Sequence, residues 1–143
     1  MIKNKTILFL FFFIYPFFSY SHVTHYDKLK MIEMDVLRNG KKIGYNNYTF
    51  ESRDNLLIVK NETKFVTKLI GINLIDLNSF STETYKNGKL VKFKSSTTQN
   101  KKKKFNVLTF DEVRKTFEIK GSSFNGFAPS TAVVGNWWNH NIF

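Results

Sequence analysis

The chain has 143 residues, carries 22 Lys and Arg against 11 Asp and Glu for a formal net charge of +11, and contains no cysteine. The missing cysteine excludes disulfides, a thiolate nucleophile, a cysteine-containing zinc site and a lipid-modified N-terminal cysteine. A basic excess is typical of proteins that bind nucleic acid or anionic membranes. Here it is almost all lysine, in a chain rich in Asn, Ile and Phe, which is the composition of an AT-rich genome. Composition therefore argues against nucleic acid as a partner.

The first 21 residues predict an export signal. Lys3 and Lys5 form a basic start, residues 6–18 are apolar and uncharged, and small residues stand at positions −3 and −1 of a cleavage site after Ser21. The apolar run is shorter than the roughly 20 residues of a membrane-spanning helix, and an uncleaved anchor is the alternative. We expect a mature chain that is soluble or peripherally bound, exported to the periplasm or secreted, with 20 basic and 11 acidic residues.

Two Asn-Gly pairs, Asn39-Gly40 and Asn87-Gly88, predict β-hairpins. Both stand between alternating apolar and polar residues, and both central residues of a type I′ turn need the positive φ that Asn and Gly tolerate. The first turn predicts the cross-strand pairs Leu37–Lys42, Val36–Ile43, Asp35–Gly44, Met34–Tyr45, Glu33–Asn46 and Ile32–Asn47. The second predicts the pairs Thr84–Val91, Glu83–Lys92 and Thr82–Phe93.

Period-2 alternation between turn residues predicts seven strands, and no stretch has the pattern of an amphipathic helix. The strands are expected at residues 28–37, 41–51, 56–67, 73–86, 89–97, 105–110 and 115–120, with a turn or bulge at 68–72 and a loop at 98–104. The predicted fold class is all-β: an antiparallel meander that forms a curved sheet or partly open barrel, behind an N-terminal signal-peptide helix. Residues 22–143 form a single β-domain in this prediction.

Four successive lysines, Lys101 to Lys104, follow the fifth predicted strand. Such a run can contact anionic lipid headgroups or nucleic-acid phosphates. A solvated hairpin tip that resists edge-to-edge aggregation is the simpler interpretation.

The sequence becomes rich in turn residues after Gly121 and ends with large aromatic rings. Residues 128–134 predict a loop that leads into a short strand, before Trp137, Trp138 and Phe143. Such rings bury large areas and need a surface to pack against. Either they pack onto the open mouth of the sheet, or the chain is a truncated copy of a longer protein.

No catalytic arrangement can be assembled from the sequence. A Gly-rich phosphate loop and a Gly-x-Ser-x-Gly elbow are both absent, and the three histidines lie near the ends of the chain. The two at the start lack a third metal ligand. Glu83 is the most suggestive carboxylate because Tyr85 and Lys92 flank it, but a cross-strand salt pair is its expected role. We predict no catalytic residue, no cofactor and no metal site.

Aromatic residues alternate with polar ones along the predicted strands. This alternation is typical of a curved sheet with an apolar interior, and equally of an ordinary core. The residues concerned are Tyr45, Tyr48, Phe50, Phe65, Phe80, Phe93, Phe110 and Phe117.

Several short motifs together resemble an exported bacterial family catalogued as domain of unknown function 6134. They are, in order, residues 39–44, 68–72, 83–90 with 96–97, 129–130 and 136–139. The resemblance covers about Met31 to Asn139 and implies export and an all-β fold, without an activity or catalytic residues. Tyr85 stands where members often carry tryptophan. The chain also stops soon after the Trp motif, where relatives continue, so residues 22–143 are expected to lack C-terminal strands.

The first functional hypothesis is an exported, non-catalytic protein of the cell envelope that binds an apolar or lipid-like ligand on the concave face of the sheet. The alternative is a structural or protein-interaction component of the envelope, which uses its exposed edge and residues 101–104. A hydrolase would need Glu83, a histidine and a serine to converge. The candidate ligand-face or family-motif residues are Gly44, Tyr45, Glu83, Tyr85, Phe93, Trp137 and Trp138.

Overall fold

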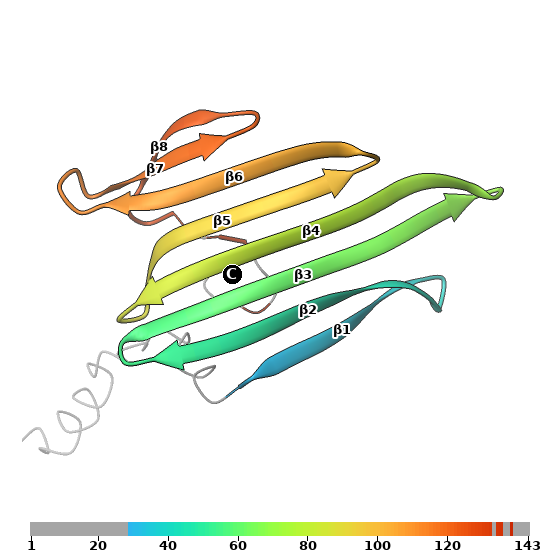
Figure 1. Ribbon diagram of the computed structural model, residues 1–143, viewed down its shortest axis with the longest axis horizontal. Coiled ribbons are helices and arrows are strands. Elements are labelled where there is room, and N and C mark those ends of the chain that lie inside the picture. Colours follow the sequence, from blue (N-terminus) through green and yellow to red (C-terminus); the bar gives the residue numbers. More distant parts are fainter. Residues whose placement is uncertain (1–28, 133, 136–137, 139–143) are drawn as a thin grey trace, which may run out of the picture.

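The computed structural model describes residues 29–132, 134, 135 and 138, and this part of the chain is all-β (Figure 1). Eight strands follow one another: β1 (Met31–Arg38), β2 (Lys41–Arg53), β3 (Leu56–Leu69), β4 (Ile72–Lys86), β5 (Lys89–Gln99), β6 (Lys102–Asp111), β7 (Thr116–Gly121) and β8 (Asn125–Pro129). Each strand pairs antiparallel with the next, so the predicted meander is confirmed. Since β1 and β8 are the two edges, the sheet is open rather than closed into a barrel.

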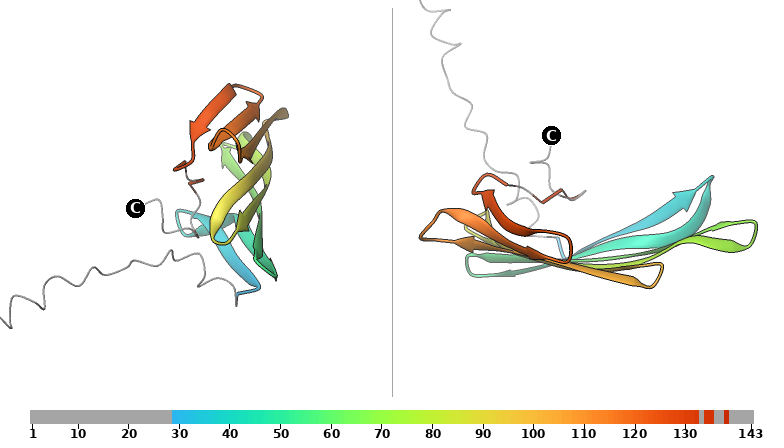
Figure 2. Two further views of the ribbon diagram at one scale, coloured as in Figure 1. Left: turned by 90° about the vertical axis from the view of Figure 1, so that its left-hand side faces the viewer. Right: turned by 90° about the horizontal axis from the view of Figure 1, so that it is seen from above.

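The sheet is one layer thick and curved (Figure 2). Both of its edges bend toward the side on which the C-terminal segment lies, and we call that side the concave face. Figure 1 looks at the opposite, convex face. A single sheet cannot bury either of its faces alone. Within the described residues, the main core forms where Trp138 of the C-terminal segment (residues 130–132, 134, 135 and 138) covers the concave face.

The predicted signal peptide, residues 1–21, lies outside the described residues. No helix in the part of the chain that the structure describes is long and apolar enough to cross a bilayer.

Two-residue turns make the first five connections between strands. The predicted turns at Asn39-Gly40 and Asn87-Gly88 are confirmed, with φ of 52° and 74° in the first and 50° and 73° in the second. The turn predicted within residues 68–72 is also confirmed. There Ile70 and Gly71 take φ of 49° and 77°, so an isoleucine holds the position that asparagine holds in the other two turns.

Each of these three turns is followed by a β-bulge three residues after its glycine. The extra residues are Ile43, Leu74 and Val91, which have no partner in the register of their strand pairs. The predicted pair Leu37–Lys42 lies before the first bulge and is confirmed. Every predicted pair beyond a bulge is wrong by one residue.

The corrected pairs change which side chains are neighbours. In the first hairpin they are Val36–Gly44, Asp35–Tyr45, Met34–Asn46, Glu33–Asn47 and Ile32–Tyr48. In the second they are Thr84–Lys92, Glu83–Phe93 and Thr82–Lys94. Because paired residues share a face, Glu83 lies beside Phe93 on the concave face and Lys92 lies on the convex face. The predicted salt pair between Glu83 and Lys92 is therefore wrong.

The strand count and most strand boundaries also differ from the prediction, the boundaries by one to three residues. Residues 98, 99 and 102–104 extend β5 and β6, because Asn100 and Lys101 already form a two-residue turn with φ of 49° and 66°. An eighth strand runs over Asn125–Pro129, where pairing with β7 overrides the low strand propensity of Asn and Gly. The short strand expected at the end of residues 128–134 is not found among those residues of that stretch that the structure describes.

The main core covers the half of the concave face that lies over β2, β3 and β4. Its buried residues are Tyr48, Phe50, Leu57, Val59, Tyr85 and Trp138, against which Ile32, Met34 and Leu90 pack. Phe117 is buried separately, with its ring 5.2 Å from that of Phe110.

Outside the main core, the concave face carries polar pairs as well as apolar side chains. Asn46 accepts hydrogen bonds from Asn61 at 2.5 Å and Thr63 at 2.8 Å, and the hydroxyls of Ser79 and Thr97 lie 2.7 Å apart. Phe65, Leu77, Phe93 and Leu108 share this face with the polar pairs, so the predicted apolar interior is right for part of the face.

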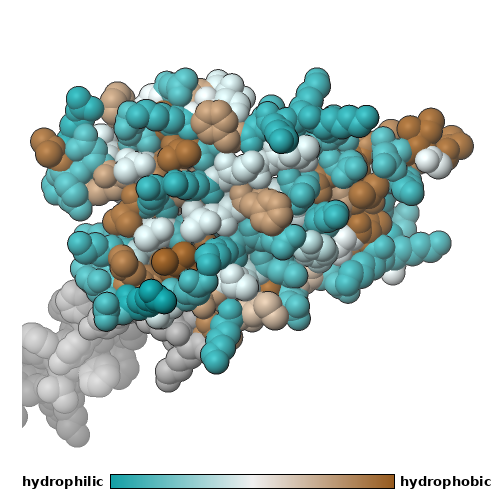
Figure 3. Space-filling view, viewed as in Figure 1, coloured by the Kyte–Doolittle hydropathy of each residue, from teal (hydrophilic) through white to brown (hydrophobic). Residues whose placement is uncertain are grey.

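The convex face is mainly hydrophilic (Figure 3). Two of the aromatic residues expected inside, Tyr45 and Phe80, lie on this face. Their strand partners Lys64 and Ser96 point to the same side.

Gly44 permits the close approach of β2 and β3 next to the first bulge. A Cβ atom there would lie 2.0 Å from the backbone oxygen of Lys64 and 2.4 Å from the Cβ of Phe65. We expect Gly44→Ala to lower the free energy of unfolding by about 3 kcal/mol, because the strands would have to separate. Urea denaturation measures this change. The control Gly135→Ala adds a Cβ with no atom within 4 Å and should change stability by about 0.5 kcal/mol or less. Equal effects would contradict the steric explanation.

Candidate functional site

Glu83, Tyr85 and Trp138 form a cluster at the centre of the core. Alternation along β4 places Glu83 and Tyr85 on the concave face, and Trp138 reaches them from the C-terminal segment. Glu83 is fully buried, and its carboxylate accepts hydrogen bonds from both Trp138 and Tyr85. The indole Nε1 of Trp138 donates to Oε1 at 3.3 Å, and the hydroxyl of Tyr85 donates to Oε2.

Ring contacts hold Trp138 on the sheet around this carboxylate. Its ring meets Phe50 edge to face, with centroids 5.7 Å apart and planes at 82°, and it meets Tyr85 at 5.6 Å and 85°. Such pairs each add about 0.5–1.5 kcal/mol beyond the burial of their area. A buried carboxylate is stable only when its oxygens are hydrogen-bonded. The cluster therefore acts as a latch that joins the C-terminal segment to β4, and we call it the Glu83 latch.

The remaining candidate residues fall in different places. Phe93 is the strand partner of Glu83, and Gly44 lies opposite Phe65 at the far end of β2. Tyr45 is on the convex face, where its hydroxyl donates to Oε1 of Glu62 at 2.6 Å. That hydrogen bond is the main reason that the pKa of Tyr45 is raised above its ordinary value. Trp137 lies outside the described residues.

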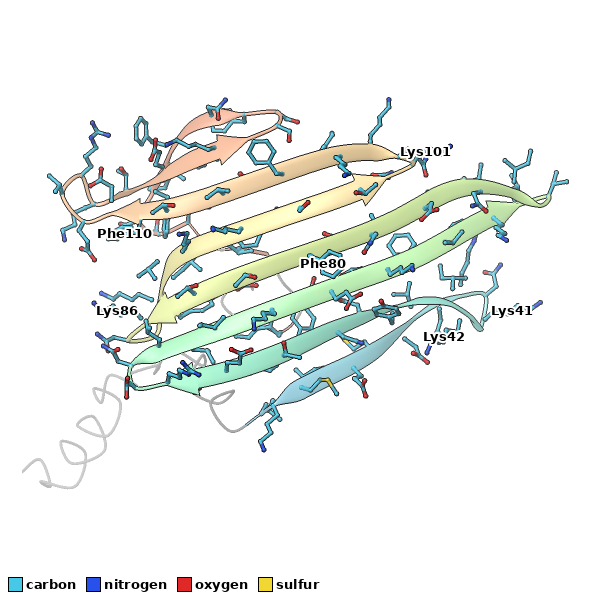
Figure 4. The ribbon with its side chains drawn as sticks, in the orientation of Figure 1. Lys41, Lys42, Phe80, Lys86, Lys101 and Phe110 are labelled. Atoms are coloured by element: carbon cyan, nitrogen blue, oxygen red, sulfur yellow. The ribbon has the colours of Figure 1, made fainter. Side chains whose placement is uncertain are left out.

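A groove of about 970 Å³ opens beside the latch, at the end of the sheet marked by Lys86 and Phe110 (Figure 4). It lies between the β4–β5 turn, the β6–β7 loop and the C-terminal segment. Its lining residues are Tyr85, Lys86, Asn87, Gly88, Lys89, Leu90, Val91, Phe110, Glu112, Lys115, Ser130, Thr131, Ala132 and Val134. The volume is within the range of small-molecule sites.

The groove has an apolar floor and a basic rim. Tyr85, Leu90 and Phe110 are concave-face residues, whereas Lys86 and Lys89 stand at the exposed β4–β5 turn. Of the lining residues, sequence reasoning had named only Tyr85 as a candidate site residue and Phe110 as an interior aromatic residue. The available signal was that the meander brings the turn after β4 and the loop after β6 to the same end of the sheet.

The β6–β7 loop at the groove is shaped by the carboxylate of Asp111. Oδ1 accepts hydrogen bonds from the backbone N–H of Val113 at 2.9 Å and of Arg114 at 3.0 Å. These two bonds, aided by the nearby Arg114 charge, hold the pKa of Asp111 below its ordinary value of 3.8. A salt bridge of 3.0 Å joins Lys115 to Glu112 in the same loop.

No group of three residues suited to hold a metal ion occurs within the described residues. The three histidines, His22, His25 and His140, all lie outside the described residues, so the convergence of Glu83 with a histidine and a serine that a hydrolase would need is not tested.

Trp138→Ala tests the latch. We expect the free energy of unfolding to fall by about 3–5 kcal/mol, because a buried ring is lost and the Glu83 carboxylate loses a donor. Phe80→Ala is a matched truncation on the convex face, where the side chain is 50% exposed, and should cost about 1 kcal/mol or less. Urea denaturation of both variants measures the difference. Similar losses would show that Trp138 does not close the core.

Asp111→Asn tests the acid sensitivity of the β6–β7 loop. A carboxyl group with a lowered pKa in the folded chain stabilises it above the ordinary pKa near 3.8, and this contribution is lost as pH falls through the folded-state pKa. The stability gap between wild type and variant should therefore be larger at pH 7 than at pH values well below 3.8. Urea titrations at the two pH values measure the gap. A gap that does not change would contradict this assignment.

Residues 34–143 match the family described as Domain of unknown function (DUF6134), and since this match covers most of the chain, the chain belongs to that family. No curated protein sequence and no solved structure matches it.

Proposed function

We propose that this family member is an exported, non-catalytic protein of the cell envelope that binds a lipid-like molecule with an anionic head. Export rests on the basic start, apolar run and small-residue cleavage site of the first 21 residues. The observation that carries the binding proposal is the 970 Å³ groove with its apolar floor and lysine rim.

The groove suits an amphipathic ligand better than a wholly apolar one. The apolar half of the concave face is already filled by Trp138, so an acyl chain would lie beside that core rather than within it. Lys86, Lys89 and Lys115 stand at the groove against the single carboxylate of Glu112. A carboxylate or phosphate head near this rim gains charge-assisted hydrogen bonds, while the acyl chain gains burial.

The double variant Lys86→Gln/Lys89→Gln tests this proposal. We expect its affinity for a fluorescent fatty acid to fall by about tenfold, because charge-assisted contacts are each worth about 1 kcal/mol or more. Binding of the corresponding fatty alcohol should not change. Fluorescence titration gives both affinities, and mass spectrometry of the purified protein shows whether a lipid is carried along.

The matched control is Lys92→Gln/Lys94→Gln, which removes two lysines from the convex face of β5. An equal loss in this control, or no uptake of either probe by the unaltered protein, would contradict lipid binding in the groove.

A second candidate is a structural or interaction component of the envelope. The outer edge of β1 favours it, because this eight-residue strand pairs only with β2 within the described residues and leaves half of its backbone groups facing outward. A site-specific crosslink from β1 to an envelope protein, in the absence of lipid uptake, would favour this candidate over the first.

A further inference from the structure

The β3–β4 hairpin extends beyond the rest of the sheet. β2 pairs with β3 only as far as Phe65, and β5 pairs with β4 only as far as Leu77. Residues 66–76 therefore pair only with one another and project past the flanking strands (Figure 1). We call this segment the finger. Its arms are residues 66–69 and 72–76, and four residues of a strand correspond to a reach of about 13 Å beyond the last pair with β2.

Apolar side chains on the finger are exposed to an unusual degree. Ile70 is 93% exposed, Ile72 70%, Leu69 52% and Leu74 46%. The hydrophobic colour at the far right of the space-filling view belongs to this hairpin tip (Figure 3). An exposed cluster of large aliphatic side chains that is rimmed by polar residues is typical of an interaction site.

The turn of the finger has a residue that is poorly suited to its backbone conformation, unlike the two Asn-Gly turns. Ile70 has a φ of 49°, a conformation that strongly disfavours a β-branched side chain, whereas Asn39 and Asn87 hold the same position elsewhere. An asparagine would suit the turn better. The exposed isoleucine therefore contributes nothing to the stability of the turn, which points to a role outside the fold.

Basic residues outnumber acidic ones around the finger. The segments 38–42, 68–74 and 100–104 contain eight basic residues: Arg38, Lys41, Lys42, Lys68, Lys101, Lys102, Lys103 and Lys104. The acidic residues next to them are Asp76 in the finger and Asp35, which forms a salt bridge of 2.5 Å with Lys42. Lys41, Lys42 and Lys101 all lie at the finger end of the sheet (Figure 4).

The side chain of Asn100 holds the lysine-rich turn against the finger. Its Nδ2 donates to the backbone oxygen of Leu74 at 3.0 Å, and its Oδ1 accepts from the N–H of Asp76 at 2.8 Å. The charged and apolar residues thus form one continuous surface.

The opposite end of the sheet differs in charge. Its turn segments 53–56, 86–89 and 111–115 carry five basic and three acidic residues, which are Arg53, Lys86, Lys89, Arg114 and Lys115 against Asp54, Asp111 and Glu112. The strong positive charge is therefore a property of the finger end and not only of the overall composition.

We propose that the finger end docks on an anionic lipid bilayer, with the aliphatic side chains of residues 69–74 inserted among the headgroups and the surrounding lysines against lipid phosphates. A reach of about 13 Å is sufficient for the 5–10 Å depth at which interfacial segments bury their apolar face. Nucleic acid would use the lysines but leave the aliphatic tip in water. A second copy of the chain would place two basic finger ends against each other, and this repulsion is absent when the finger end meets an anionic surface.

A local probe tests insertion in the full chain. Because the chain has no cysteine, Ile72→Cys can carry a single polarity-sensitive fluorophore. We expect a blue shift with vesicles that contain phosphatidylglycerol, a loss of this shift at high salt, and none with phosphatidylcholine alone. The same label at Val113, which is 92% exposed at the other end of the sheet, should not respond.

Two variants then separate the apolar contribution from the charged one. Ile70→Asn should raise the urea midpoint of unfolding while it weakens vesicle binding about tenfold. Lys101→Gln/Lys102→Gln should weaken binding about 30-fold, or about fivefold per lysine, whereas Lys92→Gln/Lys94→Gln on the convex face should not.

The proposal is overturned if the probe at residue 72 shows no shift, which is also the result if residues 1–21 alone anchor the chain. It is overturned equally if the probe at residue 113 responds as strongly, or if Ile70→Asn changes the oligomeric state rather than vesicle binding.

Discussion

The buried carboxylate of Glu83 is the contact on which the rest of this fold depends. Within the described residues the curved sheet has no second layer, and Trp138 of the C-terminal segment covers the apolar part of its concave face. Hydrophobic burial of Trp138 supplies the energy, but burial alone does not select a position. Glu83 determines where Trp138 lies on the sheet. Its buried carboxylate needs hydrogen-bond donors, and the Tyr85 hydroxyl and the Trp138 indole provide them.

Local chemistry made the turns predictable, but not the register. An Asn-Gly pair defines its own turn, so both predicted hairpins form where expected. The bulges at Ile43 and Val91 leave no comparable signal, since only two residues of each strand precede the bulge and cannot reveal the change in alternation. The error had a chemical consequence. It assigned Glu83 to a surface salt pair with Lys92, whereas the bulge at Val91 of β5 places Phe93 opposite Glu83 and moves Lys92 to the other face.

The sequence identified Glu83, Tyr85 and Trp138 as candidate site residues, but it did not predict that they contact one another. Large rings near the C-terminus need a surface, which made Trp138 a candidate for packing on the sheet. Its contact with Glu83 spans 55 positions in the chain, and no local pattern encodes such closure. The groove was missed for the same reason, because its walls come from turns that only the completed meander brings together. The exposed Ile70 was visible in the sequence, but as an ordinary apolar residue in a turn.

The two proposed binding sites lie at opposite ends of the sheet. The groove lies at the end of the sheet where β4 and β6 finish, and the finger lies at the other end. A strand of 15 residues spans about 50 Å, so a chain docked by its finger holds the groove far from the bilayer surface. A lipid in the groove would then have left the membrane to which the protein is bound. Such an arrangement suits the presentation of a ligand to a partner across the envelope better than storage of a lipid within the bilayer.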